Sequence, residues 1–357
     1  MPGWPASRWQ EILMPLKPSR SHLPLGKLPA GLLERLLRRY ARPARELLQG
    51  PATGEDAAII ATPQRWLAFK ADPITFVGSE LGSYAVEVNA NDLATRGARP
   101  RWFLMTLLLP EGKTRAALVA RIFSDVDRAC RRLGVVLCGG HTEITAGLTR
   151  PILAGAMLGT PMVRRALSTS GARPGDLLLL SKGIAIEGTS VLARAHRRAL
   201  ERRCGARLAC RAAALLERPG ISVVRDAALA LRAGGVRAMH DPTEGGLATA
   251  LHELAVAARV GLELDGDRVP VLPETRAVCD LVGAEPLGLL ASGALLVSAS
   301  PRYAASILER WRRAGISGAR IGRVLPPGAG RRLRREGRLR PLPRFARDEV
   351  ARLLEAK

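Results

Sequence analysis

The sequence is poor in aromatic residues, cysteine and lysine, and it has no long apolar run. Aromatic residues make up 4% of the chain and hydrophobic residues 47%, so Leu, Val and Ala must fill most of the core. The five cysteines are odd in number and form no C-x-x-C pair. This excludes a zinc ribbon, argues against a secreted disulfide scaffold, and favours a reducing cytoplasm. Without a run of about 18 apolar residues, no transmembrane helix is expected.

The net charge of +23 comes mostly from arginine, because only six of the 55 Lys and Arg residues are lysine and 49 are arginine. Charge of this size attracts nucleic acid or anionic membranes without specificity. The arginines are spread along the whole chain, so we interpret them as general surface cations. Residues 331–340 are arginine-rich but lack aromatic residues to stack on bases. They favour a two-stranded hairpin in which Leu333 and Leu339 face inward.

A chain of 357 residues exceeds the roughly 250–300 residues at which single cores stop growing, so two domains are expected. Strand-length apolar runs alternate with helix-length segments, which is typical of α/β domains. The turn-rich run 170–176 marks the best boundary. We expect residues 1–25 to form an irregular, proline-rich extension that is not a signal peptide. An N-terminal domain is expected over 26–165 and a C-terminal domain over 166–330. A basic hairpin with a terminal helix is expected over 331–357.

Local patterns within these domains predict the individual elements. Strands are expected at 57–61, 66–70, 102–109, 135–138, 153–158, 177–180, 236–239, 294–297 and 320–324, and near Leu262. Helices are expected over 32–40, 83–96, 114–133, 188–196, 222–234, 246–259, 273–282 and 301–314. Gly97 and Gly134 follow two of these helices, where a glycine commonly ends the last turn.

No G-x-x-x-x-G-K-[ST] loop and no G-x-G-x-x-G followed by an acid occurs, so a nucleotide would need another route. Acidic residues beside glycines or at strand ends could bind a nucleotide instead, since their carboxylates can hold the metal cation that accompanies a polyphosphate. Asp56 precedes an apolar strand, Asp72 ends one, and Asp92 lies beside Asn91 inside an apolar helix. We expect all three aspartates to be ligands. Arg96, one turn after Asp92, is the alternative explanation for that buried carboxylate.

The run Gly139-Gly140 is followed by His141, Thr142 and Glu143. A double glycine lets the backbone approach a ligand closely. A histidine and a glutamate two positions apart could then supply a metal ligand, a base, or both. The alternative is a single loop histidine with ordinary polar partners.

A second run, 240–246, leads from a strand into a helix and carries Asp241 and Glu244. Helix N-termini attract phosphate through unpaired N–H groups and the helix dipole. The alternative is that Asp241 simply caps the helix. Lys27 follows a glycine and could touch phosphate, or it could be a solvated lysine before a helix.

Four motifs occur in a fixed order along the chain. They are Gly54-Glu55-Asp56-Ala57-Ala58, Asn91-Asp92-Leu93-Ala94 with Gly97-Ala98-Arg99-Pro100, Gly139-Gly140-His141-Thr142-Glu143, and His240-Asp241-Pro242-Thr243-Glu244-Gly245-Gly246-Leu247-Ala248. Together they resemble the aminoimidazole ribonucleotide synthase-related, or PurM-like, superfamily, and within it the HypE-type hydrogenase maturation factors. The resemblance extends over about residues 26–324.

The resemblance implies two α/β domains and a homodimer whose N-terminal sheets pair across the interface. It also implies an enzyme that binds ATP with Mg²⁺ and phosphorylates an oxygen, often of an amide-like group, possibly within hydrogenase maturation. The implied catalytic residues are Asp56, Asp92, His141 and Glu143, and the implied metal ligands are Asp56, Asp72, Asp92 and Glu143. The implied nucleotide-binding residues are Lys27, Asp72, Asn91, Gly139, Gly140, Thr142, Asp241, Thr243, Glu244, Gly245 and Gly246.

The sequence departs from the HypE pattern in one respect. HypE-type factors act on a cysteine at their own C-terminus, and this sequence has no cysteine after Cys279. We therefore expect a relative that acts on another acceptor. Two alternatives stay open: a non-catalytic nucleotide-binding scaffold of the same fold, and a nonspecific nucleic-acid binder driven by the positive charge.

Overall fold

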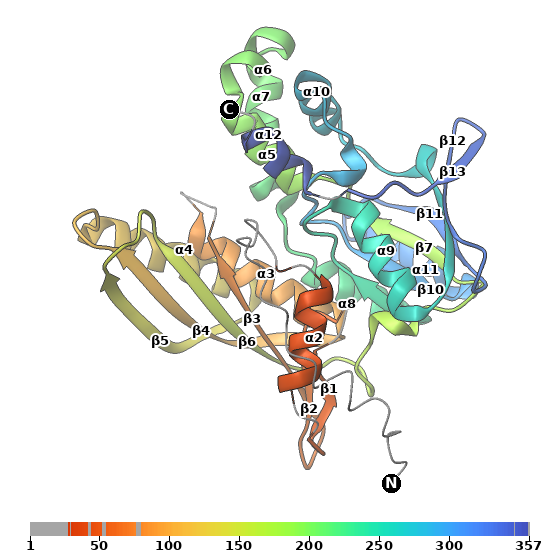
Figure 1. Cartoon of the computed structure of the whole chain (residues 1–357), viewed down its shortest axis with the longest axis horizontal. Coiled ribbons are helices and arrows are strands. Elements are labelled where there is room, and N and C mark those ends of the chain that lie inside the picture. Colours follow the sequence, from red (N-terminus) through yellow and green to blue (C-terminus); the bar gives the residue numbers. More distant parts are fainter. Residues whose placement is uncertain are drawn as a thin grey trace.

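The computed structural model describes residues 28, 30–41, 44–51, 55–75, 80–345 and 347–355. These residues build two mixed β-sheets with helices on their faces (Figure 1), so the expected two-domain α/β fold is confirmed. The expected extension over 1–25 and the candidate Lys27 lie outside the described residues. No helix among the described residues is long and apolar enough to cross a membrane. All five cysteines are free thiols.

The first sheet has six strands in the order β1-β2-β3-β6-β4-β5. Only β4 and β5 run parallel to each other. Helices α3 and α4 cover one face of this sheet (Figure 1). The elements are α2 (Ala30–Tyr40), β1 (Leu47–Gln49), β2 (Ala58–Ala61), β3 (Trp66–Ile74), α3 (Leu81–Thr95), β4 (Ala98–Pro110), α4 (Ala116–Leu133), β5 (Val136–Thr145) and β6 (Ile152–Pro161).

Helix α3 is buried on nearly every side, because it lies between the first sheet and the second domain. Gly82 allows its close packing on α4: a Cβ there would lie 2.6 Å from the carbonyl oxygen of Ile122. At the other end of α3, Ala94 packs with Val223 and Ala227 of the second domain. Polar side chains on α3 are therefore removed from solvent and held against both domains.

The second sheet has seven strands in the order β13-β12-β9-β11-β7-β10-β8. Helices α8 and α11 pack on one face through Ala227 and Trp311, and α9 packs on the other through Leu251. The elements are β7 (Leu177–Ser181), α5 (Ile186–Ala195), α8 (Val224–Ala233), β8 (Val236–His240), α9 (Gly246–Ala258), β9 (Gly261–Asp265), α10 (Pro273–Val282), β10 (Leu296–Ala299), α11 (Pro301–Arg313), β11 (Gly318–Leu325), β12 (Arg331–Arg335), β13 (Arg338–Pro341) and α12 (Glu349–Glu355).

Two helices of the second domain were not predicted. Helices α6 (Arg197–Cys204) and α7 (Ala206–Ala213) lie beside α10 at one end of the molecule (Figure 1). Helix α6 buries only Leu200. With so few apolar side chains and many arginines, its sequence shows no helical apolar period.

Strands β12 and β13 pair as an antiparallel hairpin, and β12 also joins β9 in parallel. Leu333 is buried in the core, but the side chain of Leu339 is 45% exposed. The expectation that both leucines face inward is therefore wrong for Leu339. The reason is the register of the hairpin: Leu339 is aligned with Arg334, the residue after Leu333, so it points to the face opposite that of Leu333.

Strand β5 continues through the double glycine to Thr145, where a loop was expected after Cys138. Gly139 and Gly140 have φ near +140°, a conformation that favours glycine. A Cβ on Gly140 would lie 1.8 Å from the carbonyl oxygen of Met105 on β4. The glycines therefore allow close strand pairing beside a bulge in the ladder, rather than a turn.

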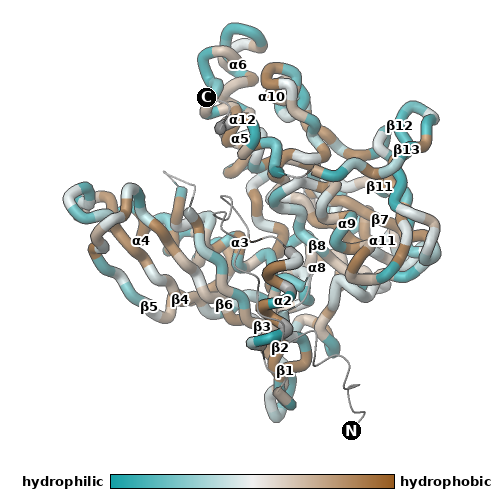
Figure 2. The backbone as a smooth tube through the Cα atoms, in the orientation of Figure 1, coloured by the Kyte–Doolittle hydropathy of each residue, from teal (hydrophilic) through white to brown (hydrophobic). Residues whose placement is uncertain are grey.

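The sheet face opposite α3 and α4 is not covered by any described element. Apolar side chains on this side of β4 and β5 are exposed, among them Trp102, Leu104 and Val136. Figure 2 shows brown stretches along the three strands β4, β5 and β6. A contiguous apolar surface on a sheet commonly marks an interaction site.

Candidate nucleotide and metal site

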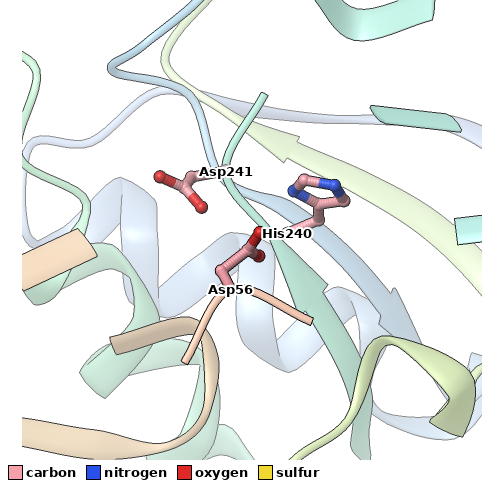
Figure 3. A group of neighbouring side chains, drawn as sticks. All are labelled: Asp56, His240 and Asp241. Carbon is pink, nitrogen blue, oxygen red and sulfur yellow. The ribbon is translucent and has the colours of Figure 1, made fainter. Parts of the chain in front are cut away.

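Three aspartates from both domains meet where the two domains face each other. Asp56 precedes β2, Asp92 lies on α3, and Asp241 follows β8. Asp56, Asp241 and the neighbouring His240 each offer one ligand atom, and these atoms all lie within 4.8 Å of one another (Figure 3). Asp241 and His240 come close to residues of the first domain because β8 contacts α3, which places the polar side chains at the end of the strand at the domain junction.

Lys70 on β3 connects two of the predicted ligands. Its Nζ lies 2.8 Å from Oδ2 of Asp92 and 3.0 Å from Oδ2 of Asp72. Burial alone would lower the pKa of Lys70, but the charges of Asp92 and Asp72 outweigh it and hold the pKa above its ordinary value. Lys70 therefore stays charged and fixes both carboxylates.

Arg96 has a different partner from the one considered in the sequence. Its buried guanidinium pairs with Glu55 and, at 3.2 Å, with Oδ2 of Asp56. It also donates to Thr169 Oγ1 at 2.8 Å and to the carbonyl oxygen of Met239 at 3.4 Å. Arg96 thus fastens the Asp56 segment to the second domain, and Asp92 is paired with Lys70 instead.

The cluster carries more negative charge than these cations balance. Burial, and then the charge of Asp241, raise the pKa of Asp92 well above its usual value. Burial and the charge of Asp56 raise the pKa of Asp241 to about 7. Burial lowers the pKa of His240, but Asp56 and Glu253 outweigh this and raise it to about 9. Burial is the largest cause of the two carboxyl shifts, and the charge of Asp56 contributes to all three. The raised pKa of His240 indicates surroundings that favour positive charge.

Asp72 and Asn91 lie beside the cluster. Asp72 is partly exposed, and its backbone N–H donates to Asn89 Oδ1 at 3.0 Å. Asn91 reaches into the second domain: its Nδ2 donates to the carbonyl oxygen of Ile221 at 2.9 Å, and its Oδ1 accepts from the N–H of Val223 at 2.8 Å. The side chain of Asn91 therefore joins the two domains.

The run 243–245 leads into α9, which begins at Gly246. Gly245 is the capping residue, so Asp241, four residues earlier, is not the cap of this helix. The N–H of Gly245 donates to Asp348 Oδ2 at 2.8 Å. At Gly246, a Cβ would lie 2.4 Å from the carbonyl oxygen of Leu287, so only glycine fits there. Glu244 belongs to the same turn.

The structure does not bring the β5 residues to this cluster within one chain. His141 Nε2 and Glu143 Oε2 form an exposed pair at 2.9 Å on the outer strand. Asp72 is aligned with Gly155 on β6, and Gly140 is three strands away in the same row. Three spacings of about 4.8 Å make about 14 Å. Gly139, Gly140, His141, Thr142 and Glu143 therefore lie apart from Asp56, Asp92 and Asp241.

Sequence reasoning missed four residues that build the site: Glu55, Lys70, His240 and Glu253. His240 Nε2 lies 2.8 Å from Oε2 of Glu253 on α9. Lys70 carried a usable signal, because it is a rare lysine inside an apolar strand just before Asp72. The other three give no local signal, since their partners are distant in sequence.

Known proteins match this chain along most of its length. Residues 54–160 match the AIR synthase related protein, N-terminal domain, and residues 173–333 match the C-terminal domain of that family. Carbamoyl dehydratase HypE of Rhodobacter capsulatus is 32% identical over 289 residues, which cover 76% of this chain and 79% of that protein. HypE of Cupriavidus necator is 32% identical over 265 residues, covering 73% of this chain and 72% of that protein.

Solved structures agree with these matches. A crystal structure of the hydrogenase maturation protein HypE in complex with ATP has a TM-score of 0.68 and 26% identity, covering 88% of this chain and 91% of that chain. The resemblance read from the four motifs is thus confirmed. The chain belongs to the AIR synthase related family, together with the HypE carbamoyl dehydratases.

Proposed function

We propose that this protein is a Mg-ATP-dependent enzyme that phosphorylates an oxygen of an amide-like acceptor, as a carbamoyl dehydratase would, in hydrogenase maturation. The observation that carries the proposal is the interaction of the buried Asp92 and Asp241 with the partly buried Asp56, in a place where acidic side chains outnumber the cations. Relatives named carbamoyl dehydratase, and a HypE structure in complex with ATP, support it.

The residues of the cluster fit a magnesium ion. Mg²⁺ binds oxygen ligands and usually needs only one or two protein carboxylates beside the phosphates. Asp56, Asp92 and Asp241 offer such oxygens, and neighbouring carboxylates, after burial, contribute to the raised pKa values of Asp92 and Asp241, which supports a place for added cation charge. When bound, the metal would neutralise charge on the transferred phosphoryl group.

The residues of the chain itself supply positioning. Lys70 and Arg96 are ion-paired with the carboxylates and leave them little freedom to rotate. Arg96 and Asp92 are buried and Lys70 is only partly exposed, so these groups are largely held in place without solvent reorganisation. Such positioning is the main protein contribution in phosphoryl transfer. Asn91 holds the two domains that share the cluster, so the site depends on their relative placement.

We also propose that two copies of the chain associate through the open face of the first sheet. His141 and Glu143 are aligned with Thr106 and Leu108, side chains that point to this open face. The pair would therefore lie in the interface between copies. A ligand role for His141 or Glu143 requires the second copy, since neither reaches the cluster of its own chain.

The test is acceptor-dependent release of phosphate from ATP, with carbamoylated and amide-bearing compounds as acceptors. We expect Asp56→Asn and Asp92→Asn to lose turnover by roughly a hundredfold or more while keeping the fold, because each removes a charge from the cation site. Asp280→Asn, on the exposed side of α10, is the matched control. Turnover like that of the unmodified protein in both active-site variants contradicts the proposal. ATP binding without phosphate release for any acceptor favours the scaffold alternative.

A further inference from the structure

One nitrogen of His240 is left without a partner inside the site. The ring is buried, with 4% of the residue exposed. Its Nε2 lies 2.8 Å from the carboxylate of Glu253, while its Nδ1 has no hydrogen-bond partner among the described residues. Figure 3 shows a ring nitrogen of His240 facing Asp241, with Asp56 beside it. Since Nε2 is held by Glu253, the nitrogen that faces the carboxylates is Nδ1.

This arrangement is the one that proteins use to present histidine to a metal. A metal-binding histidine typically donates its other N–H to a carboxylate, which fixes the tautomer and turns the lone pair toward the cation. Glu253 does this for Nε2 and leaves Nδ1 directed at two carboxylates. Buried polar nitrogens without partners are rare in folded proteins, so an unpaired Nδ1 beside two acids calls for a ligand.

We propose that His240 Nδ1, Asp56 and Asp241 together hold a divalent transition-metal ion, with Mn²⁺ as the representative of the class. The inference rests on the proposed function, because the ion would serve the same nucleotide. Imidazole nitrogen suits transition metals such as Zn²⁺, Fe²⁺ and Ni²⁺, whereas Mg²⁺ binds oxygen ligands. Mn²⁺ is the weakest binder of the first-row series, and it represents the class here because its unpaired electrons report a nitrogen ligand. The ligand atoms, within 4.8 Å of one another, lie close enough to share one ion.

A proton is the competing occupant. With a proton on Nδ1, His240 would be a cation between Asp56 and Asp241 and would offset part of their charge without metal. The two occupants differ in one measurable respect: only a metal ion bonded to Nδ1 makes the nitrogen nucleus couple magnetically to the metal's unpaired electrons.

The test is titration of the metal-free, full-length protein with Mn²⁺ and, separately, with Mg²⁺, without nucleotide. Isothermal titration calorimetry gives the affinities, and electron spin echo spectroscopy of bound Mn²⁺ reports nitrogen coupling. We expect one Mn²⁺ per chain, tighter binding than for Mg²⁺, and histidine nitrogen coupling. His240→Asn should remove the coupling and weaken Mn²⁺ binding by at least roughly tenfold while changing Mg²⁺ binding less.

Two further variants sharpen the result. Glu253→Gln should weaken Mn²⁺ binding by roughly ten- to a hundredfold, and it stays informative if His240→Asn does not fold. His252→Asn is the matched control, because His252 sits next to Glu253 but its Nε2 lies 3.0 Å from the carbonyl oxygen of Pro343. Absence of Mn²⁺ binding, Mn²⁺ bound without nitrogen coupling, or an unchanged preference for Mn²⁺ in His240→Asn overturns the inference.

The experiments distinguish a failure of this inference from a failure of the proposed function. Stabilisation by Mg-ATP without any preference for Mn²⁺ would refute the nitrogen ligand and leave the function standing. Nitrogen-coupled Mn²⁺ in a protein that does not bind ATP would refute the function and leave the metal site standing.

Discussion

Asp241→Asn should make the ligand-free protein more stable at pH 8. Burial and the charge of Asp56 raise the pKa of Asp241 from an ordinary 3.8 to about 7. Because the folded pKa lies above the unfolded one, the folded protein keeps a proton that the unfolded chain loses. Stability from this group is complete below about pH 4 and is lost as the pH rises through 7. Asparagine resembles the protonated acid at every pH, so the variant avoids the loss.

The size follows from the shift. A difference of about 3 pH units at 1.36 kcal/mol each gives a ceiling of about 4 kcal/mol. Relaxation and water entry reduce it, so we expect about 1–4 kcal/mol above pH 8 and almost nothing near pH 4. This should appear as a rise of a few degrees in melting temperature at pH 8.

Differential scanning calorimetry of the variant and its parent between pH 4 and 8 measures the effect. Asp280→Asn, which changes an exposed aspartate, should show no such pH-dependent gain. The reasoning would be refuted if Asp241→Asn were less stable than its parent at pH 8, or if its stability changed by the same amount at pH 4 and pH 8. Either result would mean that burial of the Asp241 carboxylate does not destabilise the folded protein.

Four other outcomes follow from the same geometry. Mg²⁺ should bind more tightly as the pH rises from 6 to 8, because Asp241 must lose its proton first; affinity that is flat with pH by calorimetry would contradict this. Asn91→Ala leaves two buried backbone groups unpaired and should cost roughly 2–4 kcal/mol in denaturant unfolding; a loss near zero would contradict its role between the domains. Leu104→Arg should turn a dimer into a monomer in sedimentation velocity, and a dimer that persists would move the interface elsewhere. Gly140→Ala should lower the melting temperature by several degrees, because the new Cβ would clash with the carbonyl oxygen of Met105. An unchanged melting temperature would refute the need for glycine at this position of β5.

The sequence predicts those features of the structure that depend on one short segment of the chain. Asp56, Asp92 and Asp241 were each singled out from their neighbours, and most helices and strands followed from apolar spacing. Strand β7 is a short continuous apolar run, which is typical of a buried strand, and helix α10 has apolar residues at helical spacing. Such features need no knowledge of distant partners.

What could not be predicted depends on contacts between distant segments. Lys70 and Arg96 could each have paired with Asp92, and only the packing of β3 on α3 decides for Lys70. No residue near His240 in the sequence predicts the hydrogen bond between its ring and Glu253, because that contact depends on the packing of helix α9 on β8. Gly139 and Gly140 resembled a ligand loop, since glycines in a strand and glycines in a turn have the same sequence signature.

The measurement that tests the central claim most directly is thermal unfolding with ATP, with and without Mg²⁺, for the unmodified protein and Asp56→Asn. A ligand at 100 times its dissociation constant should stabilise the protein by about 2.7 kcal/mol, a shift of a few degrees. We predict a shift that requires Mg²⁺ and is absent in Asp56→Asn. No shift at millimolar ATP, or an equal shift in the variant, would contradict a nucleotide site built on these carboxylates.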